Sequence, residues 1–374
     1  MYIHQRKEWP TFIWDNKALL VPLSNVRNLQ GKLLGKMEAI GFSLKEEAFL
    51  ETLTVDVVKS NEIEGAFLDA DQVRSSIARR LGMDVPGLVA SDRNVEGVVE
   101  MMLDATQNFN KDLTEDRLFG WHSALFPTGR SGIRKILVGD WRDDTEGPMQ
   151  VVSGPMGKER VHYEAPSSKI IDNEIKQFLE WFNPDKSKVE KNEVIEPVLK
   201  SGIAHLWFVT IHPFDDGNGR IARAIADMQL CRADGTPYRF YSMSAQIERQ
   251  KEEYYDILEM SQKGSMNITE WLTWYLSCML NALESSELLL SKVLDKARFW
   301  KNHASAIINE RQKLMINKLL DDFYGKLTTS KWAKITKCSQ DTALRDIQDL
   351  IGKNILIKES GGGRSTSYIL KSIN

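Results

Sequence analysis

The sequence of 374 residues is poor in cysteine and contains no long apolar run. Its three cysteines, Cys231, Cys278 and Cys338, stand far apart, without the spacing of a metal site, and their odd number does not suit a disulfide framework. No apolar stretch reaches the length of a membrane-spanning helix, and the first residues lack the apolar run of a signal peptide. These absences predict a cytoplasmic protein without a membrane partner.

The chain also lacks an excess of charge of one sign. Its formal net charge is -3, with 42% hydrophobic and 27% charged residues, which is the composition of an ordinary soluble globular protein. This balance gives no reason to expect nucleic acid or an acidic membrane as the main partner of the whole chain. The length is sufficient for two or three domains with separate cores.

Apolar residues recur every three or four positions over most of the chain, which predicts a mainly α fold. Thr114 and Ser244 are expected N-caps, because their hydroxyls can accept hydrogen bonds from the first-turn amides of a helix. His205 lies within an apolar helix and is expected to be a core histidine, whereas Asp143 and Asp144 are expected in a solvated loop. The predicted helices lie at roughly 45–59, 90–108, 115–125, 168–182, 193–211, 219–233, 245–262, 268–299 and 304–323.

β-Structure is predicted at two places. Residues 149–153 and 160–164 flank a turn that contains Gly and Pro, and predict a hairpin lying over the helical body. Near the C-terminus, a helix is followed by two shorter helices and two short strands, an order that predicts a winged helix-turn-helix. From Lys326 onward, nine Lys/Arg face four Asp/Glu. A contact with DNA or with a protein is therefore expected here, and the cations that would carry a DNA contact are Lys334, Lys337, Arg345 and Arg364.

One short stretch, HPFDDGNGRIAR at residues 212–223, has the composition of an anion-binding loop. His212 precedes Pro213, which excludes helical geometry, so the apolar helix before it must end there. Gly217, Asn218 and Gly219 then lead into the next helix. Small residues at such a place let backbone N–H groups converge on an anion, and the helix dipole adds to the attraction.

The charged side chains of this stretch suit phosphoryl or nucleotidyl transfer. Arg220 and Arg223 are three residues apart on one helix face, so both can reach phosphate oxygens. Asp216 offers a hard oxygen ligand for Mg²⁺, and His212 is the one group whose ordinary pKa suits a general base near neutral pH. A solvent-exposed turn or part of a calcium loop explains the aspartates and glycines, but not His-Pro-Phe and the paired arginines.

The stretch resembles the signature of the Fic (Fido) family of nucleotidyltransferases: His-Pro-Phe, any residue, Asp/Glu, Gly-Asn-Gly, Arg/Lys, two residues, Arg. Every specified position matches, and the resemblance covers roughly residues 100–290. It implies a protein adenylyltransferase that moves AMP from ATP to a Ser, Thr or Tyr hydroxyl of a target protein, or of itself, and releases pyrophosphate. It implies that His212 is the catalytic base and that Asp216 holds Mg²⁺. It also implies that ATP is bound by Asp216, Gly217, Asn218, Gly219, Arg220 and Arg223.

The same resemblance implies roles for two further segments. The predicted hairpin corresponds to the flap of the family, along which a target segment aligns by strand addition. Tyr254 and Tyr255 match tyrosines that line the adenine pocket in relatives, although an aromatic pair on a helix is more often core. Gln262 stands where the family has an asparagine. The nucleotide-facing edge of the flap would comprise Val151, Val152, Ser153 and Gly154.

A second short stretch, SNEIEG at residues 60–65, admits two interpretations. By itself it is consistent with a helix C-cap followed by a solvated carboxylate. The resemblance instead implies the inhibitory motif of Fic proteins, Ser/Thr-x-x-x-Glu-Gly/Asn. Glu64 would then pair with Arg223 and take the place of the γ-phosphate, while Ser60 steadies the helix and Gly65 ends it.

These interpretations predict three parts of the chain: residues 1–95 as an N-terminal accessory region with the inhibitory helix, 96–290 as the Fic core, and 291–374 as a linker helix and winged helix domain. Two alternatives stay open for the function. One is a nucleotide-sensing DNA-binding regulator, and the other is Fic-type transfer from a different phosphate donor. A homodimer that controls access to the site is compatible with either.

Overall fold

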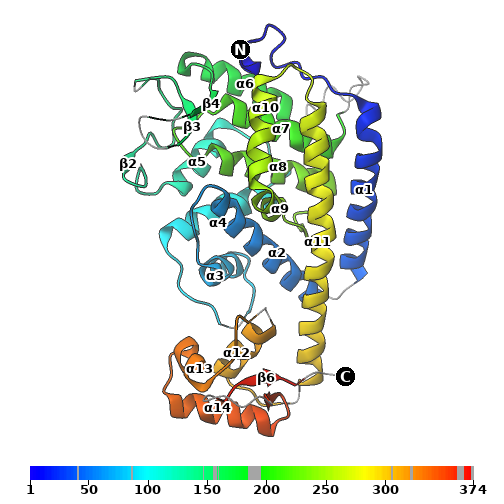
Figure 1. Cartoon of the computed structure of the whole chain (residues 1–374), viewed down its shortest axis with the longest axis vertical. Coiled ribbons are helices and arrows are strands. Elements are labelled where there is room, and N and C mark those ends of the chain that lie inside the picture. Colours follow the sequence, from blue (N-terminus) through cyan, green and yellow to red (C-terminus); the bar gives the residue numbers. More distant parts are fainter. Residues whose placement is uncertain are drawn as a thin grey trace.

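The computed structural model is mainly helical, and the few strands among the residues it describes form three small antiparallel sheets (Figure 1). It describes the whole chain except residues 40–41, 86, 146, 155–157, 159, 184–194, 305, 321–322, 360–365 and 372–374. None of the helices in the described part has the length and hydropathy of a membrane-spanning segment. The prediction of a mainly α fold is confirmed.

Two apolar helices in the middle of the chain form the centre of the larger core. α7 (Pro197–Ile211) is followed after six residues by α8 (Asn218–Asp234), and both are almost entirely buried. A helix that is apolar on all sides must be enclosed by others. Here α4 (Arg93–Gln107), α5 (Glu115–Leu125) and α6 (Ile171–Phe182) pack around the pair. The loop between α7 and α8 therefore rests on a rigid base.

The N-terminal half adds a second group of helices beside this centre. α2 (Phe42–Ile63) packs against α3 (Ala70–Arg80) and α9 (Met243–Arg249). α1 (Asn16–Ala39) lies along the long helix α11 (Thr269–Asn302), as the blue and yellow helices of Figure 1 show. The C-terminal end of α2 thereby reaches the loop that precedes α8.

Buried charges fix α2 to the central helices. Arg239 forms an ion pair with Asp227 of α8, and its guanidinium lies 3.7 Å from Asp56 of α2; all three side chains are buried. Ser242 also donates a hydrogen bond of 2.5 Å to Asp56. Burial and the neighbouring Asp56 raise the pKa of Asp227, and Arg239 opposes this shift. Two carboxyls that share one guanidinium thus determine the position of α2.

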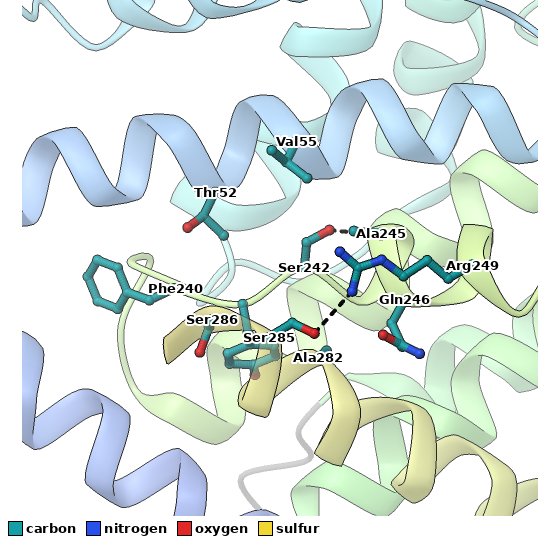
Figure 2. Close-up of a pocket in the computed structure, with 11 residues that line it drawn as sticks. Thr52, Val55, Phe240, Ser242, Ala245, Gln246, Arg249, Ala282, Ser285 and Ser286 are labelled. Atoms are coloured by element: carbon teal, nitrogen blue, oxygen red, sulfur yellow. Dashed lines mark hydrogen bonds between the residues drawn. The ribbon is translucent and has the colours of Figure 1, made fainter. Parts of the chain in front are cut away.

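A cavity of about 180 Å³ lies between α2, α9 and α11 (Figure 2). Thr52 and Val55 of α2 form one wall, and Arg249 of α9 donates a hydrogen bond of 3.1 Å to Ser285 of α11 at the other. None of residues 212–223 lines this cavity. It is therefore not the site predicted from the sequence.

The predicted hairpin is present as strands β3 (Gln150–Ser153) and β4 (Arg160–Glu164). It is anchored from behind by Tyr163, whose hydroxyl donates to the carbonyl of Thr210, 2.7 Å away, in the last turn of α7. Because this hydroxyl is a donor there, it accepts the hydrogen bond from His4 Nδ1, 2.9 Å away. The first residues of the chain thus support the hairpin.

The C-terminal module has the element order expected of a winged helix. Helices α12 (Glu310–Leu320), α13 (Thr329–Thr336) and α14 (Gln340–Gly352) precede strands β5 (Leu356–Lys358) and β6 (Tyr368–Leu370). They share a hydrophobic cluster that begins at Phe299, whereas the larger cluster ends at Leu290. The boundaries of the three predicted parts remain predictions, because α11 continues across residue 290.

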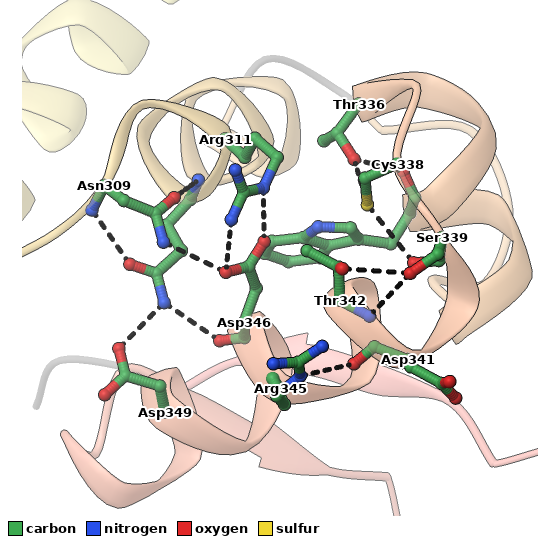
Figure 3. Close-up of polar contacts among 12 residues, drawn as sticks. Asn309, Arg311, Thr336, Cys338, Ser339, Asp341, Thr342, Arg345, Asp346 and Asp349 are labelled. Atoms are coloured by element: carbon green, nitrogen blue, oxygen red, sulfur yellow. Dashed lines mark hydrogen bonds and ion pairs between the residues drawn. The ribbon is translucent and has the colours of Figure 1, made fainter.

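Polar contacts in this module concentrate on one buried carboxylate (Figure 3). Asp346 of α14 accepts from Arg311 at 2.8 and 3.1 Å and from Asn309 at 2.9 Å, and so joins α14 to the start of α12. Lys334, Lys337 and Arg345 are exposed, whereas Arg364 lies outside the described residues. The DNA-binding surface expected from the sequence stays a prediction.

Several predicted helices differ from those observed. Residues 245–262 form two helices, α9 and α10 (Lys251–Lys263), which are separated by Gln250. The N-cap of α9 is Ser242, which accepts from the amide of Ala245, and not Ser244, whereas Thr114 caps α5 as predicted. Helices α1 and α3, and a short hairpin of β1 and β2 at residues 130–135, were not predicted.

We expect Arg239→Met to lower the free energy of unfolding by about 3–5 kcal/mol, because two buried carboxyls then lose their shared cation. Urea unfolding followed by circular dichroism measures this change. The matched control is Arg298→Met, since the pair of Arg298 with Asp295 is exposed and is worth at most about 1 kcal/mol. Equal stability of the two variants would show that the buried cluster does not hold α2.

Candidate functional site

The imidazole of His212 is held in one orientation at the end of α7. His212 adopts a left-handed backbone conformation (φ 51°), as a residue that terminates a helix before Pro213 must turn sharply. Its Nδ1 lies 3.1 Å from the carbonyl of Val209, so Nδ1 carries the hydrogen and Nε2 keeps a free lone pair. Burial lowers the pKa of His212 to about 4. The ring is therefore neutral at pH 7 and can accept a proton.

A buried arginine that the sequence did not single out supports this turn. Arg142 donates to the carbonyls of His212, at 2.7 Å, and Pro166, at 2.5 Å, and its amide donates to Pro213. Asp144 balances its charge at 3.0 Å and also accepts from Ser168. The expectation that Asp144 lies in a merely solvated loop is wrong, because its carboxylate joins Arg142, which supports the turn at His212, to the segment after the hairpin.

The loop after His212 is closed by its own side chains. Asn218 accepts from the amide of Phe214 at 2.9 Å and donates to its carbonyl at 2.7 Å. Phe214 is fully buried and stacks on the ring of His122 with centroids 4.1 Å apart. The Asn218 side chain thus shapes the loop. Only its backbone N–H remains to contribute to an anion site at the start of α8.

Two glycines leave room at this helix N-terminus. Gly217 has φ +82°, and a Cβ there would lie 2.9 Å from the ring of Phe126. A Cβ on Gly219 would lie 2.2 Å from Oε1 of Glu64. The space above Gly219 therefore already contains a carboxylate oxygen, at a place where helix amides and the helix dipole favour an anion.

Glu64 reaches this place from the end of α2 and pairs with Arg223. Arg223 Nη2 donates to Glu64 Oε1 at 2.8 Å and to the carbonyl of Ser60 at 2.8 Å, and its Nε donates to the Ser60 hydroxyl at 2.9 Å. Burial lowers the pKa of Arg223, but Glu64, Tyr254 and Tyr255 together raise it, and the net direction is upward. Gly65 has φ +76° and lets the chain leave the helix. The structure thus brings together all three residues predicted for inhibition.

Arg220 and Asp216 lie on the open side of the loop. Arg220 stacks on Phe126 at 4.9 Å, and its Nε is buried without a hydrogen-bond partner. Asp216 is partly exposed and accepts from its neighbour Gly217 and from the Ser131 hydroxyl. The described residues contain no group of three His, Cys, Asp or Glu that could hold a metal. A single carboxylate still fits Mg²⁺ that takes its other ligands from phosphates and water.

The two tyrosines predicted for the adenine pocket differ in exposure. Tyr254 is 2% exposed, and its hydroxyl lies 2.8 Å from Nε2 of His205, so it belongs to the core in this structure. Tyr255 is 40% exposed, and its hydroxyl donates to the carbonyl of Ile63 at 3.3 Å, beside Glu64. Gln262 is buried and donates weakly to Thr210. Of the two tyrosines, Tyr255 is the one with an exposed ring.

The flap residues Val151, Val152 and Ser153 lie in β3, and Gly154 follows with φ +104°. Val152 and Ser153 are exposed. The flap is joined to α10 through Glu259, which lies 3.0 Å from Arg160 and 2.5 Å from His162. No feature of the sequence pointed to Glu259, because nothing in its local pattern separates it from other surface glutamates.

The helical core that surrounds this loop has the Fic fold. A Fic family protein from Desulfovibrio desulfuricans G20 aligns over 96% of this chain and 98% of its own, with a TM-score of 0.53 and 18% identity. One from Bacteroides thetaiotaomicron aligns over 71% of this chain and 97% of its own, with a TM-score of 0.50 and 20% identity. At these identities the likeness shows the fold alone.

Family models and curated relatives agree with this fold. Residues 112–230 match the Fic/DOC family, and residues 2–83 match a domain of unknown function, DUF4172. "Protein adenylyltransferase fic-1" of Caenorhabditis elegans is 25% identical over 216 residues, which is 58% of this chain and 38% of the relative. "Protein adenylyltransferase Fic" of Culex quinquefasciatus is 33% identical over 91 residues, 24% of this chain and 16% of the relative. Residues 112–230 thus resemble the Fic/DOC family, and the chain spans less than two fifths of the length of these relatives.

We expect Glu64→Gly to lower the free energy of unfolding by about 1–3 kcal/mol, because the buried Arg223 loses its counter-ion. We expect millimolar pyrophosphate to raise the melting temperature of this variant more than that of the wild type, since the anion takes the vacated place. Thermal melts with and without pyrophosphate measure both effects. Glu62→Gly, two residues earlier and paired only with Lys59, is the control. An equal response of the three proteins would contradict the assignment.

Proposed function

We propose that this chain is a protein adenylyltransferase that uses ATP and Mg²⁺ and is inhibited by its own Glu64. The observation that carries the proposal is the contact of Glu64 with Arg223 above Gly219, beside a neutral His212. A carboxylate at a phosphate-like position implies that the site is built for an anion. The matches to curated adenylyltransferases support AMP as the transferred group.

In the proposed reaction, Nε2 of His212 accepts the proton of a target hydroxyl while the hydroxyl oxygen attacks the α-phosphorus. The bond from this phosphorus to the pyrophosphate oxygen breaks, and pyrophosphate leaves. Arg142 keeps the imidazole in place through its bond to the carbonyl of His212. Arg220, Arg223 and the first amides of α8 neutralise the phosphates. Asp216 would hold Mg²⁺, which would neutralise charge on the departing pyrophosphate.

Inhibition follows from the position of one carboxylate. With Oε1 of Glu64 on Arg223, the γ-phosphate cannot take that place, and the triphosphate must lie elsewhere. In-line attack requires the reacting atoms to be aligned at about 3–3.5 Å, so a displaced α-phosphate is not attacked. Removal of Glu64 should therefore raise transfer, with His212 still acting as the base.

The flap is proposed to orient the target protein. In the described residues β3 pairs only with β4, so its other edge is free to accept a further strand. Val151, Val152, Ser153 and Gly154 lie along this edge or at its end. Backbone pairing along this edge would place the hydroxyl of a target segment beside the α-phosphate. The target protein would then be recognised mainly by the flap and other surfaces outside the loop of residues 212–223.

Other assignments stay proposals of the same kind. A DNA-binding regulator with a nucleotide sensor, a different phosphate donor and a homodimer are each compatible with the fold. The division at residues 95 and 290 and the cytoplasmic location likewise stay predictions. No contact among the described residues favours one of these alternatives over AMP transfer, which rests on the geometry of the loop.

With α-labelled ATP and Mg²⁺, we expect Glu64→Gly to transfer label to protein at least about tenfold faster than wild type. We expect Glu64→Gly/His212→Ala to lose about 10²- to 10⁴-fold, the usual contribution of a general base. Labelled protein is measured after gel separation, with Glu62→Gly as the control that should behave as wild type. If neither Glu64→Gly nor wild type transfers label although both bind ATP, AMP transfer is wrong and another donor must be sought.

The pH dependence tests the proposed base. Because burial lowers the pKa of His212 to about 4, the imidazole loses its proton at that pH and stays neutral above it. The value of kcat/KM for Glu64→Gly should therefore be constant from neutral pH down to about pH 6 and fall only as the pH approaches the lowered pKa. The carboxylate of Glu64 raises the pKa of His212, so its removal cannot shift the acidic limb of the kcat/KM profile to higher pH. A midpoint at the ordinary imidazole pKa of 6.5 would contradict the buried-base assignment.

A further inference from the structure

Three side chains at the flap form a hydrogen-bonded chain that the proposed transfer does not use. Ser153 Oγ lies 2.6 Å from His162 Nε2, and His162 Nδ1 lies 2.5 Å from Oε2 of Glu259. A carboxylate only accepts, so Nδ1 carries the hydrogen and Nε2 accepts from the Ser153 hydroxyl. A hydroxyl, an imidazole and an orienting carboxylate in this order are the parts of an activated nucleophile.

An irregularity of the hairpin places His162 in this chain. Val151 pairs with Tyr163, whereas Val152 pairs with Val161, so His162 is the extra residue of β4. A bulge of this kind redirects a side chain that would otherwise follow the alternation of the strand. Here it lets one ring contact Ser153 on the neighbouring strand and Glu259 on α10 at the same time.

The charge and exposure of the three groups suit a reactive serine. Although burial raises the pKa of Glu259, hydrogen bonds from His162, Lys263 and Arg160 lower it to about 2. The carboxylate is therefore ionised at neutral pH and can hold Nδ1–H. Ser153 is exposed, so a reagent or a phosphate group can reach its oxygen.

The chain also borders the nucleotide site proposed above. Tyr255 and Glu259 lie four residues apart on α10 and share one face of the helix. The hydroxyl of Tyr255 contacts the carbonyl of Ile63, immediately before Glu64. One helix face thus extends from the inhibitory carboxylate to the flap, and Ser153 lies at the flap end of it.

We propose that Ser153 is an activated nucleophile, with His162 as its base and Glu259 as the orienting carboxylate, and that it accepts AMP within this chain. The second clause rests on the proposed function. The Ser153 oxygen attacks the α-phosphorus of ATP, the bond to pyrophosphate breaks, and the hydroxyl proton passes to His162 Nε2. The product is an AMP ester on Ser153, and pyrophosphate leaves.

Diisopropyl fluorophosphate tests the nucleophile without nucleotide. The serine oxygen bonds to phosphorus, fluoride leaves, and the proton passes to His162. We expect mass spectrometry to locate the adduct on Ser153 in the wild type, and Ser153→Ala to show none there. We expect His162→Gln to react about 10²-fold more slowly, the usual contribution of a base, and Glu259→Gln to react more slowly as well.

Two variants control for effects on structure. Arg160→Gln removes a second contact between the flap and Glu259 but leaves the chain intact, so it should react within about twofold of the wild type. Ser24→Ala removes an exposed hydroxyl on α1 and should not change the rate. If Ser153 does not react, or reacts as fast in His162→Gln as in the wild type, the proposal is overturned and the chain only attaches the flap to α10.

Labelled ATP with Glu64→Gly then separates the two proposals. Label on Ser153 that is lost in Glu64→Gly/His162→Gln supports Ser153 as the acceptor. Label found only on other residues supports AMP transfer but overturns Ser153 as its acceptor. No label at all, with Ser153 still reactive toward the fluorophosphate, overturns the proposed function and the acceptor role, while the activated serine stands.

Discussion

A guanidinium enclosed by protein requires an anion beside it, and most of the site can be understood from this requirement at Arg223. Its side chain is 2% exposed and has three hydrogen bonds to the end of α2, one of them to the carboxylate of Glu64. An unpaired buried charge costs several kcal/mol, so the cation must keep either Glu64 or a bound anion. In the proposed function, two anions compete for this one cation, and inhibition then needs no separate regulatory site.

This competition works only if α2 is held in position. The cluster of Asp56, Arg239 and Asp227 fixes the middle of the helix to α8, the same helix that carries Arg223. At its end, the amide of Ala66 bonds to the carbonyl of Asn61, which closes the last turn. The helix that leads to Glu64 and the helix that carries Arg223 are thus parts of one packed unit.

The sequence allowed the loop and the inhibitory motif to be predicted because each lies within a dozen consecutive residues. Pro213 alone implied the end of α7, and the spacing of Arg220 and Arg223 implied a common face. Arg142 and Glu259 could not be found in this way, since their roles depend on contacts with segments tens of residues away. The break at Gln250 was also missed, because no Gly or Pro marks it.

The two tyrosines predicted for the adenine pocket have different surroundings, and that role stays a prediction for both. The residue type and spacing match the family, yet the side chain of Tyr254 bonds to His205 and packs in the core. The ring of Tyr255 lies 5.2 Å from that of Tyr254, and its hydroxyl reaches the backbone beside Glu64.

Because the backbone of the last turn of α2 is closed, the smallest movement that frees Arg223 is a rotation of the Glu64 side chain, which is already about one third exposed. Such a rotation breaks one charge-assisted hydrogen bond and leaves both bonds from Arg223 to Ser60 in place. In the proposed inhibition, a single contact, and not the position of the helix, decides whether Arg223 binds the Glu64 carboxylate or a phosphate. The free-energy difference between these two states can therefore be adjusted over a few kcal/mol.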